Sequence, residues 1–150
     1  MNRNQSLHIR LRSDSDEQVE IADVSVDVIF LMQGRERYSF HAGTTDAHGE
    51  LSAAYEVFET ARKAEASLSI MDYNDGLEEC DSTIRIRIPS IEELRRRADA
   101  VKKFYPEDAR PVLTRLEKSG NAEIAAEPLP IRLKSEGVTQ IDVPVQLKVR

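Results

Sequence analysis

Two histidines and one aspartate lie close together in the sequence, and their side chains could hold a metal ion. His41, Asp46 and His48 fall within one expected strand-turn-strand segment. Imidazole and carboxylate groups are suitable ligands for zinc and other transition metals. The segment has no His-x-His or His-x-x-His pair, and strand alternation can direct His41 away from the turn. We therefore prefer an ordinary polar turn, with a metal-binding or small-ligand site at residues 43–49 as the alternative.

A second acidic segment, from Asp72 to Asp81, could attract calcium. Its composition is similar to that of an EF-hand loop, but its spacing is not. With Asp72 as the first ligand, Gly76 comes one place too early and Thr83 stands where the bidentate glutamate is needed. Because strands rather than helices are expected on both sides, a solvated turn is the better interpretation.

Groups that could act as nucleophiles carry no recognisable motif. Cys80 is the only cysteine, and the acidic residues around it disfavour its thiolate form. No Gly-x-Ser-x-Gly elbow or phosphate-binding glycine loop occurs. Aromatic residues make up 5% of the chain and tryptophan is absent, so stacking platforms for sugars are scarce. We predict a chain that is not an enzyme and needs no cofactor; an enzyme whose site is assembled from distant residues ranks last among the alternatives.

Alternating apolar and polar residues predict β-strands over most of the chain. The pattern is clearest where Leu7, Ile9 and Leu11 alternate with polar residues, and again at Thr83–Ile88. Near Phe30 the pattern becomes wholly apolar, which predicts burial on both faces. We expect strands over residues 6–12, 21–32, 38–41, 51–58, 68–72, 83–88 and 138–149, with a hairpin around the 43–49 turn and a loose connector over 121–130.

One segment changes to helical spacing. Apolar residues recur every three or four positions from Ile91 to Tyr105, and Ser90 with Glu93 forms a capping box. A helix over about 90–104 follows, and a second short helix over 112–116 is compatible with Pro111. Because strands lie on both sides, we interpret residues 90–118 as a helix or helical hairpin inserted into one β domain spanning 1–150.

The segment from Val24 to Phe58 resembles the carboxypeptidase-regulatory-like and bacterial Ig-like sandwiches of the prealbumin type. In those families a Thr-Asp-x-x-Gly turn joins two strands, and here that turn is Thr45-Asp-Ala-His-Gly49. Asp46 can cap backbone N–H groups of its own turn, and Gly49 can adopt the left-handed conformation that closes it. The resemblance implies a mainly β chain, an Ig-like antiparallel β-sandwich, acting as a spacer, adhesion or docking module. The helical insert and the lack of an export signal argue against extracellular adhesion.

Charge and hydropathy exclude two classes of partner. The formal net charge is −6, so the average field repels phosphate backbones and anionic lipid headgroups, and neither nucleic acid nor membrane is expected. No stretch approaches the roughly 20 apolar residues of a membrane span, and the N-terminus has no apolar signal core. With one cysteine, these features predict a cytoplasmic protein.

Basic residues gather on the expected helix of this acidic chain. A basic patch on an acidic protein can dock an acidic partner, although Glu and Lys or Arg four residues apart are also typical of ordinary exposed helices. Our leading hypothesis is a non-catalytic protein-interaction or scaffold module that binds another protein through the insert. A homodimer, through helix contacts or the strands around Ile84 and Val143, is a further expectation. The candidate partner-binding residues are Arg95, Arg96, Lys102 and Lys103.

Overall fold

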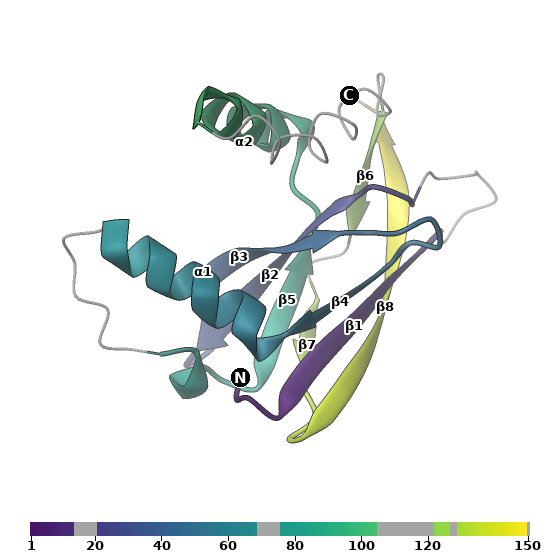
Figure 1. Cartoon of the computed structure of the whole chain (residues 1–150). Coiled ribbons are helices and arrows are strands. Elements are labelled where there is room, and N and C mark those ends of the chain that lie inside the picture. Colours follow the sequence, from purple (N-terminus) through teal and green to yellow (C-terminus); the bar gives the residue numbers. More distant parts are fainter. Residues whose placement is uncertain (14–20, 69–75, 105–121, 127–128, 150) are drawn as a thin grey trace.

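Two four-stranded β-sheets pack face to face in the computed structural model, which describes residues 1–13, 21–68, 76–104, 122–126 and 129–149 (Figure 1). One sheet has the strand order β4-β1-β8-β6 and the other β3-β2-β5-β7. The fold is therefore the predicted mainly β sandwich with a small helical part. Its elements are β1 (Gln5–Ser13), β2 (Ser25–Met32), β3 (Arg35–Thr44), β4 (Glu50–Ala54), α1 (Tyr55–Leu68), the 3₁₀ turn η1 (Leu77–Glu79), β5 (Thr83–Arg87), α2 (Ile91–Phe104), β6 (Ala122–Ala126), β7 (Pro130–Arg132) and β8 (Gly137–Val149).

The period-2 pattern places alternate side chains on opposite faces, as predicted. In β1, Leu7, Ile9 and Leu11 are buried in the core, while Arg10 and Arg12 face solvent. In β8, Ile141 and Val143 are buried in the same core. Burial of such aliphatic side chains contributes about 1.5–3 kcal/mol each, which explains why the pattern selects this arrangement.

One strand pair departs from the antiparallel arrangement. β1 and β8 run parallel, with Gln5 opposite Gly137 and Ser13 opposite Val145. A parallel pair needs a long crossover connection, and here most of the chain lies between the two strands. The strands around Ile84 and Val143, which we expected to offer edges for dimerisation, are β5 and β8 and have neighbours on both sides. The homodimer stays a prediction.

The strand β2 is buried on both faces, as predicted for its apolar end. Phe30 packs into the core, where its ring lies 5.0 Å from the ring of Phe58, centroid to centroid. Ile29 and Leu31 point the other way and are also buried. β2 is therefore the central strand around which the second sheet is organised.

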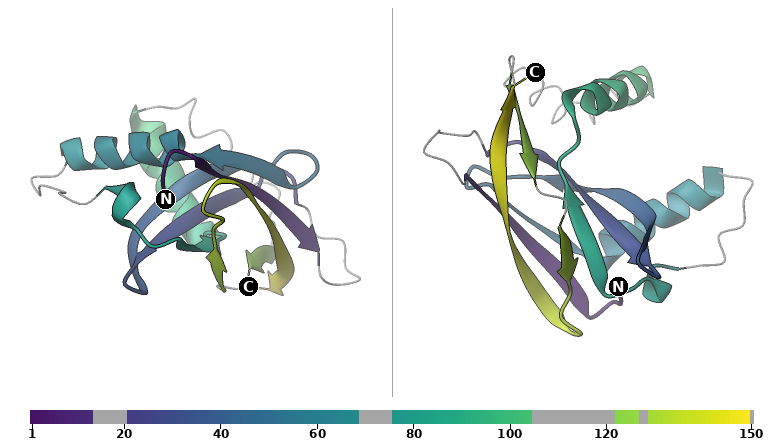
Figure 2. Two further views of the ribbon diagram at one scale, coloured as in Figure 1. Left: turned by 90° about the horizontal axis from the view of Figure 1, so that it is seen from below. Right: turned by 180° about the vertical axis from the view of Figure 1, so that it is seen from behind.

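The strand predicted over 51–58 is wrong beyond Ala54, where α1 begins. Leu51, Ala53 and Tyr55 fit alternation, but Tyr55 and Phe58 are three residues apart and both buried, which is helical spacing. α1 leaves β4 and runs beside β3, so Phe58 reaches the core (Figures 1 and 2). The strand expected over 68–72 is also wrong at Leu68, the last residue of α1, and its other residues lie outside the described part.

The inserted helix is confirmed as α2, which follows β5 and lies beyond the end of that strand (Figure 2). Only half of the capping box forms: the backbone N–H of Glu93 donates to Ser90 Oγ at 3.2 Å. The second short helix predicted over 112–116 lies outside the described residues, as does the rest of the insert to residue 118. The loose connector predicted over 121–130 is wrong in part, because Ala122–Ala126 pairs with β8 as β6 and buries Ile124. Neither α1 nor α2 combines the length and the apolar character that spanning a bilayer requires.

The turn at residues 45–49 has the predicted local structure but a different role. Asp46 Oδ1 accepts hydrogen bonds from the backbone N–H groups of His48, at 2.8 Å, and Glu50, at 3.0 Å. Gly49 is left-handed, with φ +77°. The expected hairpin is wrong, since β3 pairs with β2 and β4 pairs with β1. The turn carries the chain from one sheet to the other.

Replacing Gly49 tests whether this crossing is sterically constrained. A Cβ atom at Gly49 would lie 2.7 Å from Ile21 Cδ1 and 3.1 Å from Ile21 Cβ. We expect Gly49→Ala to lower the free energy of unfolding by about 2–3 kcal/mol, through backbone strain and this overlap. Gly34→Ala is the matched control, because Gly34 has φ +76° but nothing within 4 Å of its added Cβ. Gly34→Ala should lower the free energy of unfolding by only about 1 kcal/mol. Urea titration of both variants measures the two losses, and equal losses would contradict the steric account.

Candidate functional site

A buried carboxylate connects α2 to the sandwich. The side chain of Asp27 on β2 is only 1% exposed. Arg97 of α2 donates to both of its oxygens, with Nη1 3.0 Å from Oδ1 and Nη2 2.6 Å from Oδ2, and Arg87 Nη2 of β5 lies 3.0 Å from Oδ2. A bidentate arginine is among the strongest partners for a carboxylate, and burial of an unpaired charge costs several kcal/mol. The pairing therefore joins two strands and the inserted helix.

Two further residues complete this anchor cluster, which we define as Asp27, His41, Arg87, Glu93 and Arg97. Glu93 Oε2 lies 3.1 Å from Arg87 Nη2 and 3.9 Å from Arg97 Nη2. The β2–β3 register shifts between Val26 and Asp27, and beyond this bulge His41 stands opposite Asp27. His41 Nδ1 lies 3.7 Å from Asp27 Oδ1.

The anchor cluster keeps Asp27 ionised. Burial by itself raises the pKa of a carboxyl group, but the contacts with His41, Arg97 and Arg87 outweigh burial and lower the pKa of Asp27 to about 2. The same contact with Asp27 raises the pKa of Arg97. The folded protein therefore carries a full ion pair beneath α2 at neutral pH.

The anchor divides the basic residues of α2 into two groups. Arg97 turns towards β2, and Ile91, Leu94 and Ala98 are buried along the same side of the helix. Arg95 and Arg96, both predicted to bind a partner, are exposed. Lys102 and Lys103 also belong to α2, and their side chains lie outside the described part.

The three residues of the alternative metal site do not converge. His41 faces Asp27, whereas Asp46 and His48 stay in the turn, where Asp46 caps backbone groups. Within the described ranges, no three His, Cys, Asp or Glu side chains gather as a metal site requires. The side chain of His41 therefore points away from the turn, as the alternation of side chains along a strand allows.

The structure describes only part of the acidic segment 72–81, and this part includes Cys80. Residues 72–75 lie outside the described part, so the suggested calcium loop is not seen as a whole. Asp81 Oδ2 accepts the backbone N–H of Gly34 at 3.1 Å and so supports the β2–β3 turn. Cys80 is buried and not in a disulfide.

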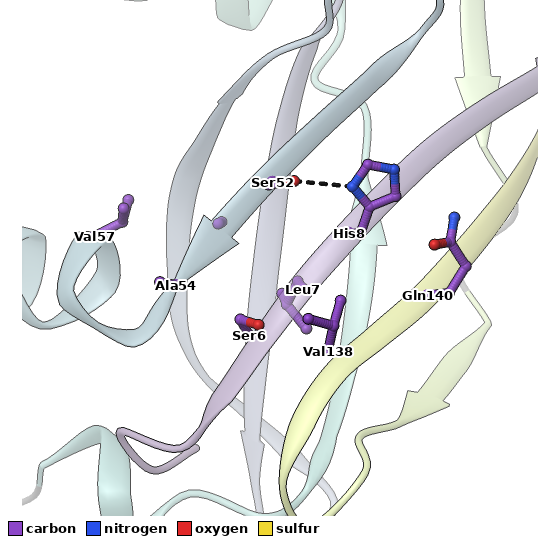
Figure 3. A pocket seen from close by; sticks show the side chains of 9 residues that line it. Ser6, Leu7, His8, Ser52, Ala54, Val57, Val138 and Gln140 are labelled. Atoms are coloured by element: carbon purple, nitrogen blue, oxygen red, sulfur yellow. Dashed lines mark hydrogen bonds between the residues drawn. The ribbon is translucent and has the colours of Figure 1, made fainter.

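A hollow of about 590 Å³ lies on the outer face of the β4-β1-β8 sheet (Figure 3). The strand register sets outward-facing residues side by side in rows, with Ser6 between Ala54 and Val138, and His8 between Ser52 and Gln140. The small side chains of Ser6 and Ala54 leave space between larger neighbours. The sheet-face hollow, as we call it, is open and mostly apolar, and it is lined by Ser6, Leu7, His8, Ser52, Ala53, Ala54, Val57, Val138 and Gln140.

His8 bridges two residues of β4 at the edge of this hollow. Its Nδ1 lies 2.9 Å from Ser52 Oγ, and its Nε2 lies 3.3 Å from Glu50 Oε1. None of these three residues stood out in the sequence, because no motif links position 8 to positions 50 and 52. A correct prediction that β1 pairs with β4 would have identified this contact, because Ser52 lies directly opposite His8.

Comparisons with protein-family models, with curated proteins and with solved structures gave no match for this chain. The interpretation of both regions, the anchored helix and the sheet-face hollow, therefore depends on their own geometry.

Removing Arg97 tests whether the anchor holds the helix. We expect Arg97→Gln to lower the free energy of unfolding by about 2–3 kcal/mol, because Asp27 would stay buried with only part of its compensation. Arg96→Gln, one residue away on the exposed side, should change it by less than about 0.5 kcal/mol. Chemical denaturation of both variants measures this difference, and equal effects would show that Arg97 is an ordinary surface residue.

Acid should weaken the anchor with a defined sign. Because the pKa of Asp27 is lowered from 3.8 to about 2 on folding, its contribution is present above about pH 4 and is lost as the pH falls towards 2. The gap in unfolding free energy between the wild type and Asp27→Asn should shrink by about 2 kcal/mol over that interval. A gap that is independent of pH would mean that the carboxylate charge contributes nothing.

Proposed function

We propose that this chain is a protein-interaction module in which the β-sandwich is a scaffold and α2 binds an acidic segment of another protein. The observation that carries the proposal is the division of charge on α2. Arg97 is paired with Asp27 inside the anchor cluster, while Arg95 and Arg96 point to solvent on the same helix. A helix fixed in this way presents its exposed cations in one orientation, which reduces the entropy lost on binding.

Electrostatics defines the chemistry of the partner. The whole chain has a net charge of −6, and the exposed guanidinium groups of Arg95 and Arg96 provide local positive charge on α2 that selects for acidic groups. Arginine binds carboxylates through two parallel hydrogen bonds, which gives geometric as well as charge selectivity. A segment rich in Asp and Glu is therefore the expected ligand.

The architecture supports the same role. The two-sheet, mainly β architecture supports assignment to the prealbumin-type, Ig-like sandwiches, whose members usually act as docking or spacer modules. The chain has a single cysteine and so no internal disulfide, which fits the cytoplasmic location that we predict. No contact of the described residues favours the alternative of a ligand or metal site at 43–49, so we do not propose it.

Charge reversal on α2 tests the proposal. The full chain should bind a fluorescent polyglutamate peptide, and Arg95→Glu with Arg96→Glu should weaken binding by about tenfold or more, measured by anisotropy. The matched control is Arg132→Glu with Lys134→Glu, which makes the same charge change at two exposed positions, one at the end of β7 and one just after it. It should weaken binding only slightly.

Two results would contradict this function. If the two double variants lose the same affinity for the peptide, only the net charge of the chain matters. If the wild type does not bind the peptide at low salt, the proposal of an acidic partner is wrong. Circular dichroism of each variant checks that the fold is unchanged, since neither pair belongs to the anchor cluster.

A further inference from the structure

We propose that Ser52 is the nucleophile of an ester-hydrolysing site in the sheet-face hollow, with His8 as its general base and Glu50 as a positioning residue. This site is separate from α2, because it lies on the outer face of the β4-β1-β8 sheet, whereas the anchor cluster belongs to the other sheet. It does not depend on the proposed function. Neighbouring strands create this arrangement, and no sequence motif encodes it.

The strand register brings the three side chains together. Ser52 stands directly opposite His8, and Glu50 lies two residues before Ser52 and so on the same face of β4. His8 Nδ1 is 2.9 Å from Ser52 Oγ, and Nε2 is 3.3 Å from Glu50 Oε1 (Figure 3 shows the contact with Ser52). A nucleophile within hydrogen-bond reach of a base, which is itself oriented by a third group, defines an activated nucleophile.

The carboxylate selects the useful tautomer of the imidazole. When Nε2–H donates to Glu50, the neutral ring leaves the lone pair of Nδ1 free to accept the hydroxyl proton of Ser52. The assignment of roles follows from the two contacts, since only Nδ1 faces the serine. The roles of the two ring nitrogens are interchanged relative to the serine-protease arrangement, and their chemistry is unchanged.

The hollow supplies access and a place for substrate. The side chains of His8 and Glu50 are 29% and 32% exposed, and Ser52 is exposed, so a ligand can reach all three. Ala54, Val57 and Val138 give the hollow an apolar wall beside Ser52. An open, mostly apolar hollow of this size fits the acyl part of a small, uncharged ester.

The reaction balances with water as the only co-substrate. Ser52 Oγ forms a bond to the carbonyl carbon while its proton moves to His8 Nδ1. The bond from that carbon to the alcohol oxygen then breaks, and the alcohol leaves with the proton from His8. Water attacks the acyl-serine in the same way, releases the carboxylic acid and regenerates Ser52.

Covalent labelling tests the nucleophile directly. The full chain is incubated with a fluorophosphonate probe, and intact-mass and peptide mass spectrometry locate the adduct. We expect a single adduct on Ser52, and p-nitrophenyl acetate should be hydrolysed on the order of 100-fold faster by the wild type than by Ser52→Ala. Acylation of the His8 imidazole alone would survive in Ser52→Ala, and that result would overturn the proposal.

Three variants separate chemistry from structure. His8→Ala should lose labelling, and added imidazole should restore part of it, because a free base can take the proton. Glu50→Gln should lower kcat by on the order of tenfold and leave KM unchanged, as expected for a residue that orients His8. Ser39→Ala, at an exposed serine of β3, should behave as the wild type. An adduct at another residue, no adduct at all, or equal rates in the wild type and Ser52→Ala would each refute the site.

Discussion

The carboxylate of Asp27 is the constraint on which the inserted helix depends. It lies in the middle of the sheet on a strand that is buried on both faces, where an uncompensated charge would cost several kcal/mol. Compensation comes from Arg87 on the next strand and Arg97 on α2, and these contacts outweigh the effect of burial and leave the group ionised. The helix therefore belongs to the sandwich and is not an independent appendage. A variant without the insert would leave Asp27 buried with only Arg87 and His41 as partners.

Because side chains alternate between the two faces of a strand, each strand contributes both to the core and to the outer surface of its sheet. In β1, Leu7 and Ile9 build the core, while Ser6 and His8 line the outer hollow. A shift of one residue in the register would exchange these faces, so correct burial of the core also fixes which side chains meet outside. The 45–49 turn contributes by carrying the chain across to β4, which then pairs with β1 and places Ser52 opposite His8.

Local patterns predicted the local structure, but they could not show how distant segments combine. Alternation located β1, β5 and β8, helical spacing located α2, and Asp46 with Gly49 defined the turn. The strand predicted at Tyr55 was wrong because its apolar spacing fits two periods, and packing of Phe58 against Phe30 decides between them. The hairpin at 43–49 was wrong because turn chemistry does not determine which strand each arm joins.

The candidate functional residues show the same division. Exposed Arg95 and Arg96 follow from helix periodicity, since polar residues opposite an apolar stripe face solvent. Arg97 instead pairs with Asp27, which is 70 residues away in the sequence, and this contact could not be inferred from the spacing of residues in the helix. His8 and Ser52 meet only because β1 and β4 pair. A search for motifs finds only catalytic groups that are close in sequence. The absence of a motif therefore says nothing about groups that strand pairing brings together.

Hydrogen–deuterium exchange of α2 in the wild type and in Arg97→Gln tests the central claim that the Asp27–Arg97 pair fixes this helix on the sandwich. We predict slow exchange of the α2 amides in the wild type and markedly faster exchange in the variant, with β1 and β8 unchanged. Equal exchange of α2 in the two proteins would show that the ion pair does not hold the helix, and the account of a fixed docking surface would be contradicted.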